Sequence, residues 1–159
     1  MRRAEKEIKD RRRIDSIIRR CRVCRLGMAD GDTPYVIPIC FGYDGQFLYF
    51  HSAPQGRKLD ILRKNNRVCF EFDIAEDLME AEDACKWGIR YQSVIGTGTV
   101  RIVEDPAGKR QALAAVMAQY SSRTFDFPEH ALKGTVVIKA SIETLTGKQS
   151  AGSTPADER

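Results

Sequence analysis

The segment Thr33–Tyr43 constrains the fold most, because it is apolar on both faces of the strand that it predicts. Successive side chains of a strand point to opposite faces. One apolar row can cover a core, so the other row requires a second cover, such as a partner subunit or a flat ligand. Pro38 cannot donate to a sheet, which leaves neighbouring N–H groups available to a ligand. An ordinary edge strand is the simpler alternative.

The stretch that follows the Asp44-Gly45 turn changes from strand to helix. Residues 47–50 predict a strand, and Ser52 is the expected N-cap of a helix that ends at Asn65-Asn66. Arg57 and Lys58 then fall in or near the first helical turn. Free N–H groups, the positive end of the helix dipole and two cations would converge there, which predicts an anion site, most commonly for phosphate. A surface connection with solvated basic residues is the alternative.

Two further helices are predicted at the periphery. Residues 8–21 have apolar positions at helical spacing, with arginines on the other side. Asp105-Pro106 supplies an N-cap and a first-turn proline for the other helix. The remaining apolar segments alternate as strands do and are joined mostly by turns. The predicted strands are residues 22–29, 33–43, 47–50, 67–73, 87–103 and 134–145.

This pattern favours a mainly β fold, an antiparallel barrel or sandwich with peripheral helices. The acidic segment 75–86 is predicted as a solvated loop or short helix, and Gly96 and Gly98 as points where a barrel strand bends. Residues 1–148 are expected to form a single domain. Residues 149–159 are small and polar and are predicted to form a tail.

Charge is distributed unevenly along the chain. Residues 1–25 carry 11 Lys and Arg against 4 Asp and Glu, whereas residues 26–159 carry 15 against 18. A basic arm can contact nucleic acid, but no nucleic-acid module accompanies it, so a solvated helix face is favoured. No apolar run is long enough to span a membrane, and the N-terminus is too charged for a signal peptide. We therefore expect a cytoplasmic protein without a nucleic-acid or membrane partner.

The five cysteines do not predict a disulfide framework, because their number is odd and no signal peptide is expected. Cys21-x-x-Cys24 is compatible with a redox pair or half of a zinc site, but a second pair of ligands is missing. Core packing is favoured over either role. No metal site is therefore predicted.

Several short motifs occur in an order and spacing that resemble a known family. They are Val23-Cys24-Arg25-Leu26-Gly27, Tyr35-Val36-Ile37-Pro38-Ile39, Leu48-Tyr49-Phe50-His51-Ser52-Ala53, Gly56-Arg57-Lys58, Val68-Cys69-Phe70-Glu71, Cys85-x-Trp87, Tyr91-x-Ser93-Val94-Ile95-Gly96 and Thr146-Gly147-Lys148. The chain resembles the pyridoxamine 5′-phosphate oxidase-like split-barrel flavoproteins, in the branch called 5-nitroimidazole resistance proteins. The resemblance covers roughly residues 8–148.

The resemblance implies a six-stranded antiparallel FMN-binding split barrel that forms a homodimer, with FMN at the subunit interface. Arg57 and Lys58 would bind the flavin phosphate, and His51 would be an active-site residue near flavin and substrate. The other implied cofactor contacts are Ile37, Pro38, Ile39, Cys40, Ser52, Ala53, Trp87, Gln92 and Ser93. Gln92 departs from the pattern, because members of this branch often carry arginine there, so cofactor or substrate preference can differ.

Three functions are compatible with these residues. The first is an FMN-dependent oxidoreductase that reduces a small molecule, possible substrates being nitroaromatic compounds; His51 would position or protonate the substrate. The second is the same scaffold acting on haem, deazaflavin or pyridoxamine phosphate, since fold does not fix function. The third is a non-enzymatic flavin-binding protein. The sequence contains no nicotinamide fingerprint, so the electron donor stays open.

Overall fold

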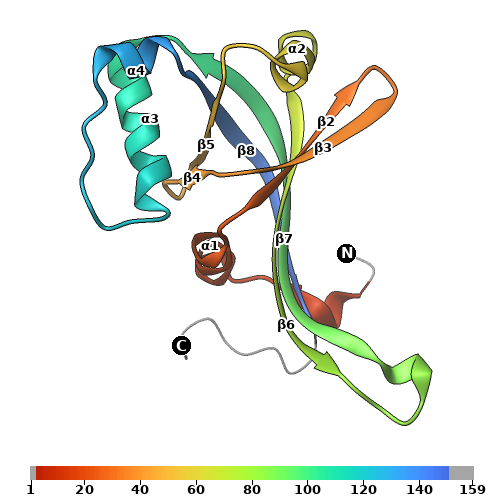
Figure 1. Ribbon diagram of the computed structural model, residues 1–159. Coiled ribbons are helices and arrows are strands. Elements are labelled where there is room, and N and C mark those ends of the chain that lie inside the picture. Colours follow the sequence, from red (N-terminus) through yellow and green to blue (C-terminus); the bar gives the residue numbers. More distant parts are fainter. Residues whose placement is uncertain (1–2, 151–159) are drawn as a thin grey trace.

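The computed structural model describes residues 3–150, in which eight strands form one antiparallel sheet (Figure 1). The strands are β1 Glu7–Ile8, β2 Cys24–Asp30, β3 Thr33–Ile39, β4 Gly42–Tyr43, β5 Phe47–Ser52, β6 Arg67–Met79, β7 Gly88–Val103 and β8 Val136–Gln149. Their order is β3-β2-β6-β7-β8-β5-β4, with β1 paired to β8. The sheet curls without closing, which confirms the predicted split barrel.

The strand count differs from the predicted six for two reasons. Two residues near the N-terminus form β1, which pairs Glu7 with Lys148. In addition, the predicted strand Thr33–Tyr43 is interrupted after Ile39, and the chain resumes as β4 on the other side of the barrel. Strands β3 and β4 are the two ends of the strand order and do not pair with each other. The barrel is therefore open between them.

The helices surround the sheet. They are α1 Arg11–Arg20, α2 Arg57–Lys64, α3 Pro106–Ala118 and α4 Glu129–Lys133, with 3-10 turns η1 Ala4–Lys6 and η2 Ala84–Lys86. In Figure 1, α2 lies at the top, whereas α3 and α4 lie on the left. Across residues 3–150 we find no helix with the length and apolar character needed to cross a membrane.

Helix α1 packs into the lower part of the barrel. It begins after Asp10, whose side chain accepts a hydrogen bond from the Arg12 backbone, so it starts later than the predicted residue 8. Ile14, Ile17 and Ile18 are buried on one face, as the helical spacing predicted. The arginines on the other faces leave this apolar face to cover the core.

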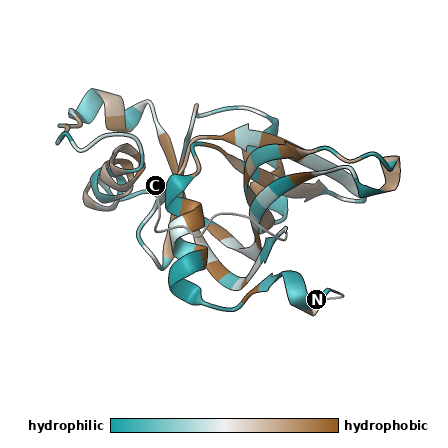
Figure 2. Ribbon diagram, turned by 90° about the horizontal axis from the view of Figure 1, so that it is seen from below, coloured by the Kyte–Doolittle hydropathy of each residue, from teal (hydrophilic) through white to brown (hydrophobic). Residues whose placement is uncertain are grey.

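The main core lies between α1 and the inner face of the sheet. The rings of Phe41 and Phe72 have centroids 4.8 Å apart, and those of Phe70 and Phe72 are 6.3 Å apart. A second, smaller cluster forms where Tyr49 and Val137 pack against α3. Figure 2 shows hydrophobic and hydrophilic segments interspersed along the strands around the barrel.

The acidic segment 75–86, predicted as a solvated loop or short helix, differs from that prediction in its first five residues. Strand β6 continues to Met79 and β7 begins at Gly88, so the two strands form a long hairpin. Residues 80–83 and the 3-10 turn η2 connect the strands, as a loop or short helix would. The register shifts between Ala75 and Leu78, and Leu78 then pairs with Ile89. Acidic composition concealed this short strand extension. We call residues 76–90 the β6–β7 arm, which projects at the lower right of Figure 1.

The C-terminal strand is longer than predicted. Strand β8 runs to Gln149, and the Ser150 hydroxyl accepts a hydrogen bond from the Tyr91 backbone at 3.0 Å. The first two residues of the predicted tail therefore belong to the fold. Residues 151–159 lie outside the described part of the chain.

The middle of β7 requires glycine at position 96. A Cβ atom there would lie 2.7 Å from Cζ of Phe70 and 2.6 Å from the Thr144 carbonyl oxygen. We expect Gly96→Ala to lower the free energy of unfolding by about 1–3 kcal/mol, because the backbone or the Phe70 ring must shift. Urea denaturation followed by circular dichroism measures this change.

Gly27→Ala is the matched control, since its Cβ would lie 3.5 Å from its nearest neighbour, the Cys69 carbonyl oxygen. Equal stability of the two variants would contradict the close approach at Gly96.

Candidate functional site

Helix α2 begins at Arg57, and its first turn lacks a side-chain cap. The N-cap is Gly56, whose φ of 134° is a conformation that glycine adopts readily. The prediction that Ser52 caps the helix is wrong. Ser52 pairs with Val136 at the end of β5, so the strand ladder uses this residue before the helix can begin. The first N–H groups of α2 are consequently available to a ligand.

Arg57 connects the start of α2 to strand β3. Its guanidinium lies 4.6 Å from the centroid of the Tyr35 ring. A guanidinium nitrogen is also 3.9 Å from a carboxylate oxygen of Asp30, at the end of β2. The arginine is therefore held over the strand that carries Ile37 and Pro38.

Lys58 is half-buried beside Arg57 in the first turn of α2. Burial lowers the pKa of Lys58, because a charged ammonium loses hydration there. Among residues 3–150 no carboxylate pairs with this side chain. A partly desolvated cation without a counter-ion is suited to bind an anion.

Strand β3 presents its two faces differently. Ile37 and Ile39 are half-buried and pack against the main core, whereas Pro38 and Cys40 are exposed. Val36 is also on the exposed face, with 61% of its surface accessible. Since β3 is an end of the strand order, one of its backbone edges is unpaired within the described residues. The outer face thus remains apolar and uncovered, as the sequence indicated.

The predicted site residues His51 and Ser52, at the end of β5, lie on opposite faces of the strand. His51 is exposed and shares a strand face with Tyr49, toward the second core cluster. Ser52 is half-buried on the opposite face, and Ala53 follows the strand in an exposed position. The three residues approach the start of α2 through the exposed segment 53–56.

Trp87 and Ser93 lie at the other end of the sheet. Asp30 and Ser93 are separated by about seven ladder positions, or roughly 20 Å at about 3.3 Å per residue. Trp87 lies further along the β6–β7 arm, where its ring nitrogen donates to the Ala81 carbonyl at 2.6 Å. Within a single chain, Trp87 and Ser93 therefore lie far from Arg57.

Gln92 is fully buried, with 0% of its surface exposed. Its side-chain oxygen accepts from Arg20 at 3.3 Å, and its nitrogen donates to Glu76 at 3.3 Å. The predicted contact of Gln92 with a cofactor stays a prediction, but the structure gives the side chain partners within the chain. It points inward, opposite to Ser93.

A charged cluster on the outer sheet face was missed by the sequence analysis. Arg25 hydrogen-bonds to Glu71 at 3.0 Å and also to Asp73. Burial raises the pKa of Glu71, as does repulsion from Asp73, while Arg25 opposes the change. The alternation of these residues placed each on an outward face, but only the β2–β6 register, which pairs Arg25 with Glu71, shows that they meet.

The Cys21 and Cys24 thiols are buried in the core, in agreement with the favoured interpretation. Burial raises the pKa of Cys21 to about 12, so it is not a reactive thiolate. In residues 3–150 no group of His, Cys, Asp or Glu is arranged to hold a metal ion.

Among the described residues, a large cavity lies away from the start of α2. This cavity, of about 600 Å³, is lined by residues of α3 and of the segment 125–128, and it includes none of the predicted site residues. The predicted residues at the start of α2, on β3 and at the end of β5 instead border an open surface, whereas Trp87, Gln92 and Ser93 lie elsewhere.

These features define a class, the antiparallel split barrels that have a cationic helix start beside an uncovered apolar strand. Residues 10–149 match the family model described as pyridoxamine 5′-phosphate oxidase, and the chain belongs to that family. No match was found among curated proteins.

Solved structures support the same family. A protein of Bacteroides thetaiotaomicron, named as a candidate 5-nitroimidazole antibiotic resistance protein, is 35% identical, with a TM-score of 0.82 over 90% of this chain and 86% of that one. A flavocytochrome of Azotobacter vinelandii is 20% identical, with a TM-score of 0.84 over 96% and 73% of the two chains. A protein of Mycobacterium smegmatis that binds FAD and haem is also 20% identical, with a TM-score of 0.84 over 93% and 75%. The last two show the fold alone.

The Arg25 cluster makes stability depend on pH. A carboxyl whose pKa is raised on folding contributes stability that is lost as pH rises through that pKa. Arg25→Ala removes the cation that opposes the raised pKa of Glu71. We expect a loss of about 1 kcal/mol near pH 7.5 and a smaller loss near pH 4, because these groups are partly exposed. Urea denaturation at both pH values tests this, and an equal loss at both would contradict it.

Proposed function

We propose that this protein binds FMN at the start of α2 and along β3, and that it acts as an FMN-dependent oxidoreductase. The observation that carries the proposal is Lys58, a half-buried cation without a counter-ion in the described chain, in the first turn of a helix whose N-terminus has no side-chain cap. A phosphate dianion matches this arrangement in charge and in hydrogen-bonding capacity.

The residues around Lys58 fit the other parts of FMN. Arg57 adds a second cation, and its contact with Tyr35 directs the site toward β3. The flat isoalloxazine ring would cover the exposed Pro38 and Cys40 at the end of β3, beside an unpaired strand edge that offers backbone groups. This placement answers what the sequence required, a cover for the second apolar face of Thr33–Ile39.

A second copy of the chain would complete the site. Trp87 and Ser93 lie too far from Arg57 to share a ligand within one chain, given the register of β2 with β6 and of β6 with β7. Two copies that pack their outer faces in opposite directions bring the lower end of one sheet to the upper end of the other. We therefore propose a homodimer with two-fold symmetry and the flavin between its subunits.

The chemistry divides between the flavin and the protein. FMN, when bound, supplies electron transfer to a small-molecule acceptor. His51 would donate a proton from an imidazole nitrogen to that acceptor, because it is exposed at the end of β5 and histidine is the commonest general acid in enzymes. The name of the Bacteroides relative favours nitroaromatic acceptors of the 5-nitroimidazole type.

Lys58→Ala should weaken FMN binding about ten- to a hundred-fold. A hydrogen bond to a charged group contributes ~1.5–3 kcal/mol, and about 1.4 kcal/mol corresponds to a factor of ten. The measurement is the Kd from quenching of FMN fluorescence. Lys133→Ala, an exposed lysine of α4, is the control and should bind as wild type does. Equal affinity of both variants would remove Lys58 from the site.

FMN affinity should also fall at alkaline pH. Burial lowers the pKa of Lys58, whereas a bound phosphate favours its charged form, so binding is tightest below that pKa and declines above it. Lys58→Arg keeps its charge to higher pH and should bind FMN with less decline. A decline of the same size in Lys58→Arg and wild type would assign the pH effect to another group.

His51→Ala should lower the turnover number about a hundred-fold, since general acid catalysis contributes typically ~10²–10⁴. Turnover is measured with NADH or NADPH as the reductant and a 5-nitroimidazole as the acceptor. His130→Ala replaces the other histidine, which is exposed on α4, and serves as the control. Full turnover by His51→Ala would exclude the proton-donor role, and wild type that binds FMN without any turnover would favour a flavin-binding protein.

A further inference from the structure

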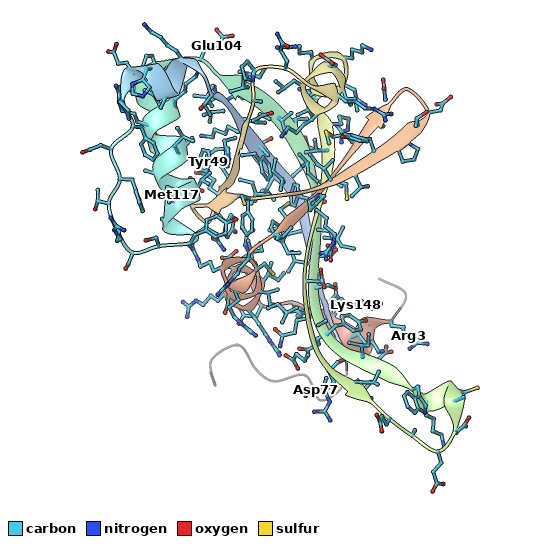
Figure 3. All side chains as sticks on the ribbon, in the orientation of Figure 1. Arg3, Tyr49, Asp77, Glu104, Met117 and Lys148 are labelled. Atoms are coloured by element: carbon cyan, nitrogen blue, oxygen red, sulfur yellow. The ribbon has the colours of Figure 1, made fainter. Side chains whose placement is uncertain are left out.

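The β6–β7 arm lacks a third strand along its whole length. Strand β7 pairs with β8 only from Gln92 onward, and β6 pairs with β2 only as far as Glu71. In the described chain, residues 76–90 therefore form a ribbon of two strands closed by the turn η2. Figure 3 labels Asp77 where the arm leaves the barrel. An isolated two-stranded ribbon is marginally stable in water, so this arm needs an additional contact.

The arm exposes large apolar side chains. Leu78 and Ile89 are paired across the ribbon and share one face, with 57% and 52% of their surfaces accessible. Trp87 follows at the end of the arm and is 49% exposed. Exposed apolar residues gathered on one projecting element are typical of an interaction surface.

The same arm is acidic. Residues 76–90 contain five Asp and Glu but only two Lys and Arg. Asp77, Glu80 and Glu82 form no ion pair with any residue between 3 and 150. A partner surface for the arm should therefore combine an apolar patch with excess positive charge.

The opposite end of the sheet has these properties. Helix α2 contains four Lys and Arg against the single Asp60. Arg63 and Lys64 contact carboxylates only at 3.5 Å and 4.0 Å. Val36, the most exposed large apolar residue of the described chain, lies on the outer face of β3, the strand that Arg57 joins to α2.

We propose that the β6–β7 arm of one subunit clasps the α2 end of a second copy of this chain. Leu78 and Ile89 would cover the apolar face around Val36, and Glu80 and Glu82 would face Arg63 and Lys64. The inference rests on the proposed homodimer, in which the two sheets run in opposite directions. It adds the surface that holds the copies together and sets the dimer orientation.

Helix α1 is also basic but is a poorer partner for the arm. Arg11 bonds to Asp15 and Tyr43, and Arg13 bonds to Gln149. Arg19 and Arg20 donate to Tyr43 and Gln92. These four α1 arginines therefore already have hydrogen-bond partners within their own chain. Arg63 and Lys64 of α2 have only the longer contacts with Asp60 and Asp30 in the described chain.

A charge exchange tests the proposal. Replacing Glu80 and Glu82 by Lys should raise the dimer Kd at least ten-fold in analytical ultracentrifugation, because like charges would then face each other. Adding Arg63→Glu and Lys64→Glu should restore the Kd to within about three-fold of wild type. The matched control adds Arg12→Glu and Arg22→Glu of the α1 region instead and should not restore it. Wild-type affinity in the first variant, or rescue by the control pair, would overturn the proposal.

A photo-crosslink locates the contact independently. Benzoylphenylalanine in place of Ile89 should give a covalent dimer whose joined peptide, identified by mass spectrometry, contains residues of β3 or α2. The same probe in place of Tyr120, an exposed residue outside the proposed interface, should give no dimer. Crosslinks from position 89 to α1, or within one chain only, would contradict the clasp.

FMN titration of the same variants separates this proposal from the proposed function. A crosslink from position 89 to α2 in a protein that binds no FMN would support the clasp and refute the flavin site. Normal FMN binding by a protein whose dimer ignores the charge exchange would refute the clasp alone.

Discussion

The antiparallel ladder of β7, which pairs with β6 on one side and β8 on the other, determines where every other element lies. From Gln92 to Thr99 the strand is paired on both sides and belongs to the barrel, whereas its first residues, 88–90, belong to the two-stranded arm. The register shift between Thr97 and Gly98 lies within the part that is paired on both sides. Because β7 is one continuous strand, a shift of its pairing with β8 would also shift the residues that β7 contributes to the arm.

The same ladder explains why charges are separated on this molecule. The cations of α2 lie above the upper end, the carboxylates of the arm lie at the lower end, and Arg25 joins Glu71 and Asp73 between them. A single chain thus has a cluster of cations on α2 and a cluster of carboxylates on the arm. In the proposed dimer, these two clusters would steer the copies toward an antiparallel encounter before apolar surfaces touch.

Local signals in the sequence predicted much of the fold. Asp105 caps α3, the Asp44-Gly45 turn joins β4 to β5, and Arg57 and Lys58 open α2. Interactions between distant strands were harder to predict. The cap at Ser52 failed because the β5–β8 ladder extends that far, and the extension of β6 beyond Asp73 was concealed by its acidic composition.

The candidate site shows the same division. Residues that act through one helix end or one strand face could be found from the sequence, as with Lys58 and Val36. Gln92 could not, because its inward direction follows from the register with Ile74 and from the position of α1. Side chains one residue apart on a strand, such as Gln92 and Ser93, belong to different environments, and a motif read as a unit does not distinguish them.

The bridge from Arg20 through Gln92 to Glu76 has a consequence for how this chain can change over time. The side-chain oxygen of Gln92 accepts from Arg20 while its nitrogen donates to Glu76. An arginine at position 92 would place a second buried cation beside Arg20, although it could still pair with Glu76. We therefore expect the two positions to be epistatic: arginine at 92 should cost less stability when Arg20 has first been replaced by a neutral residue than in the reverse order.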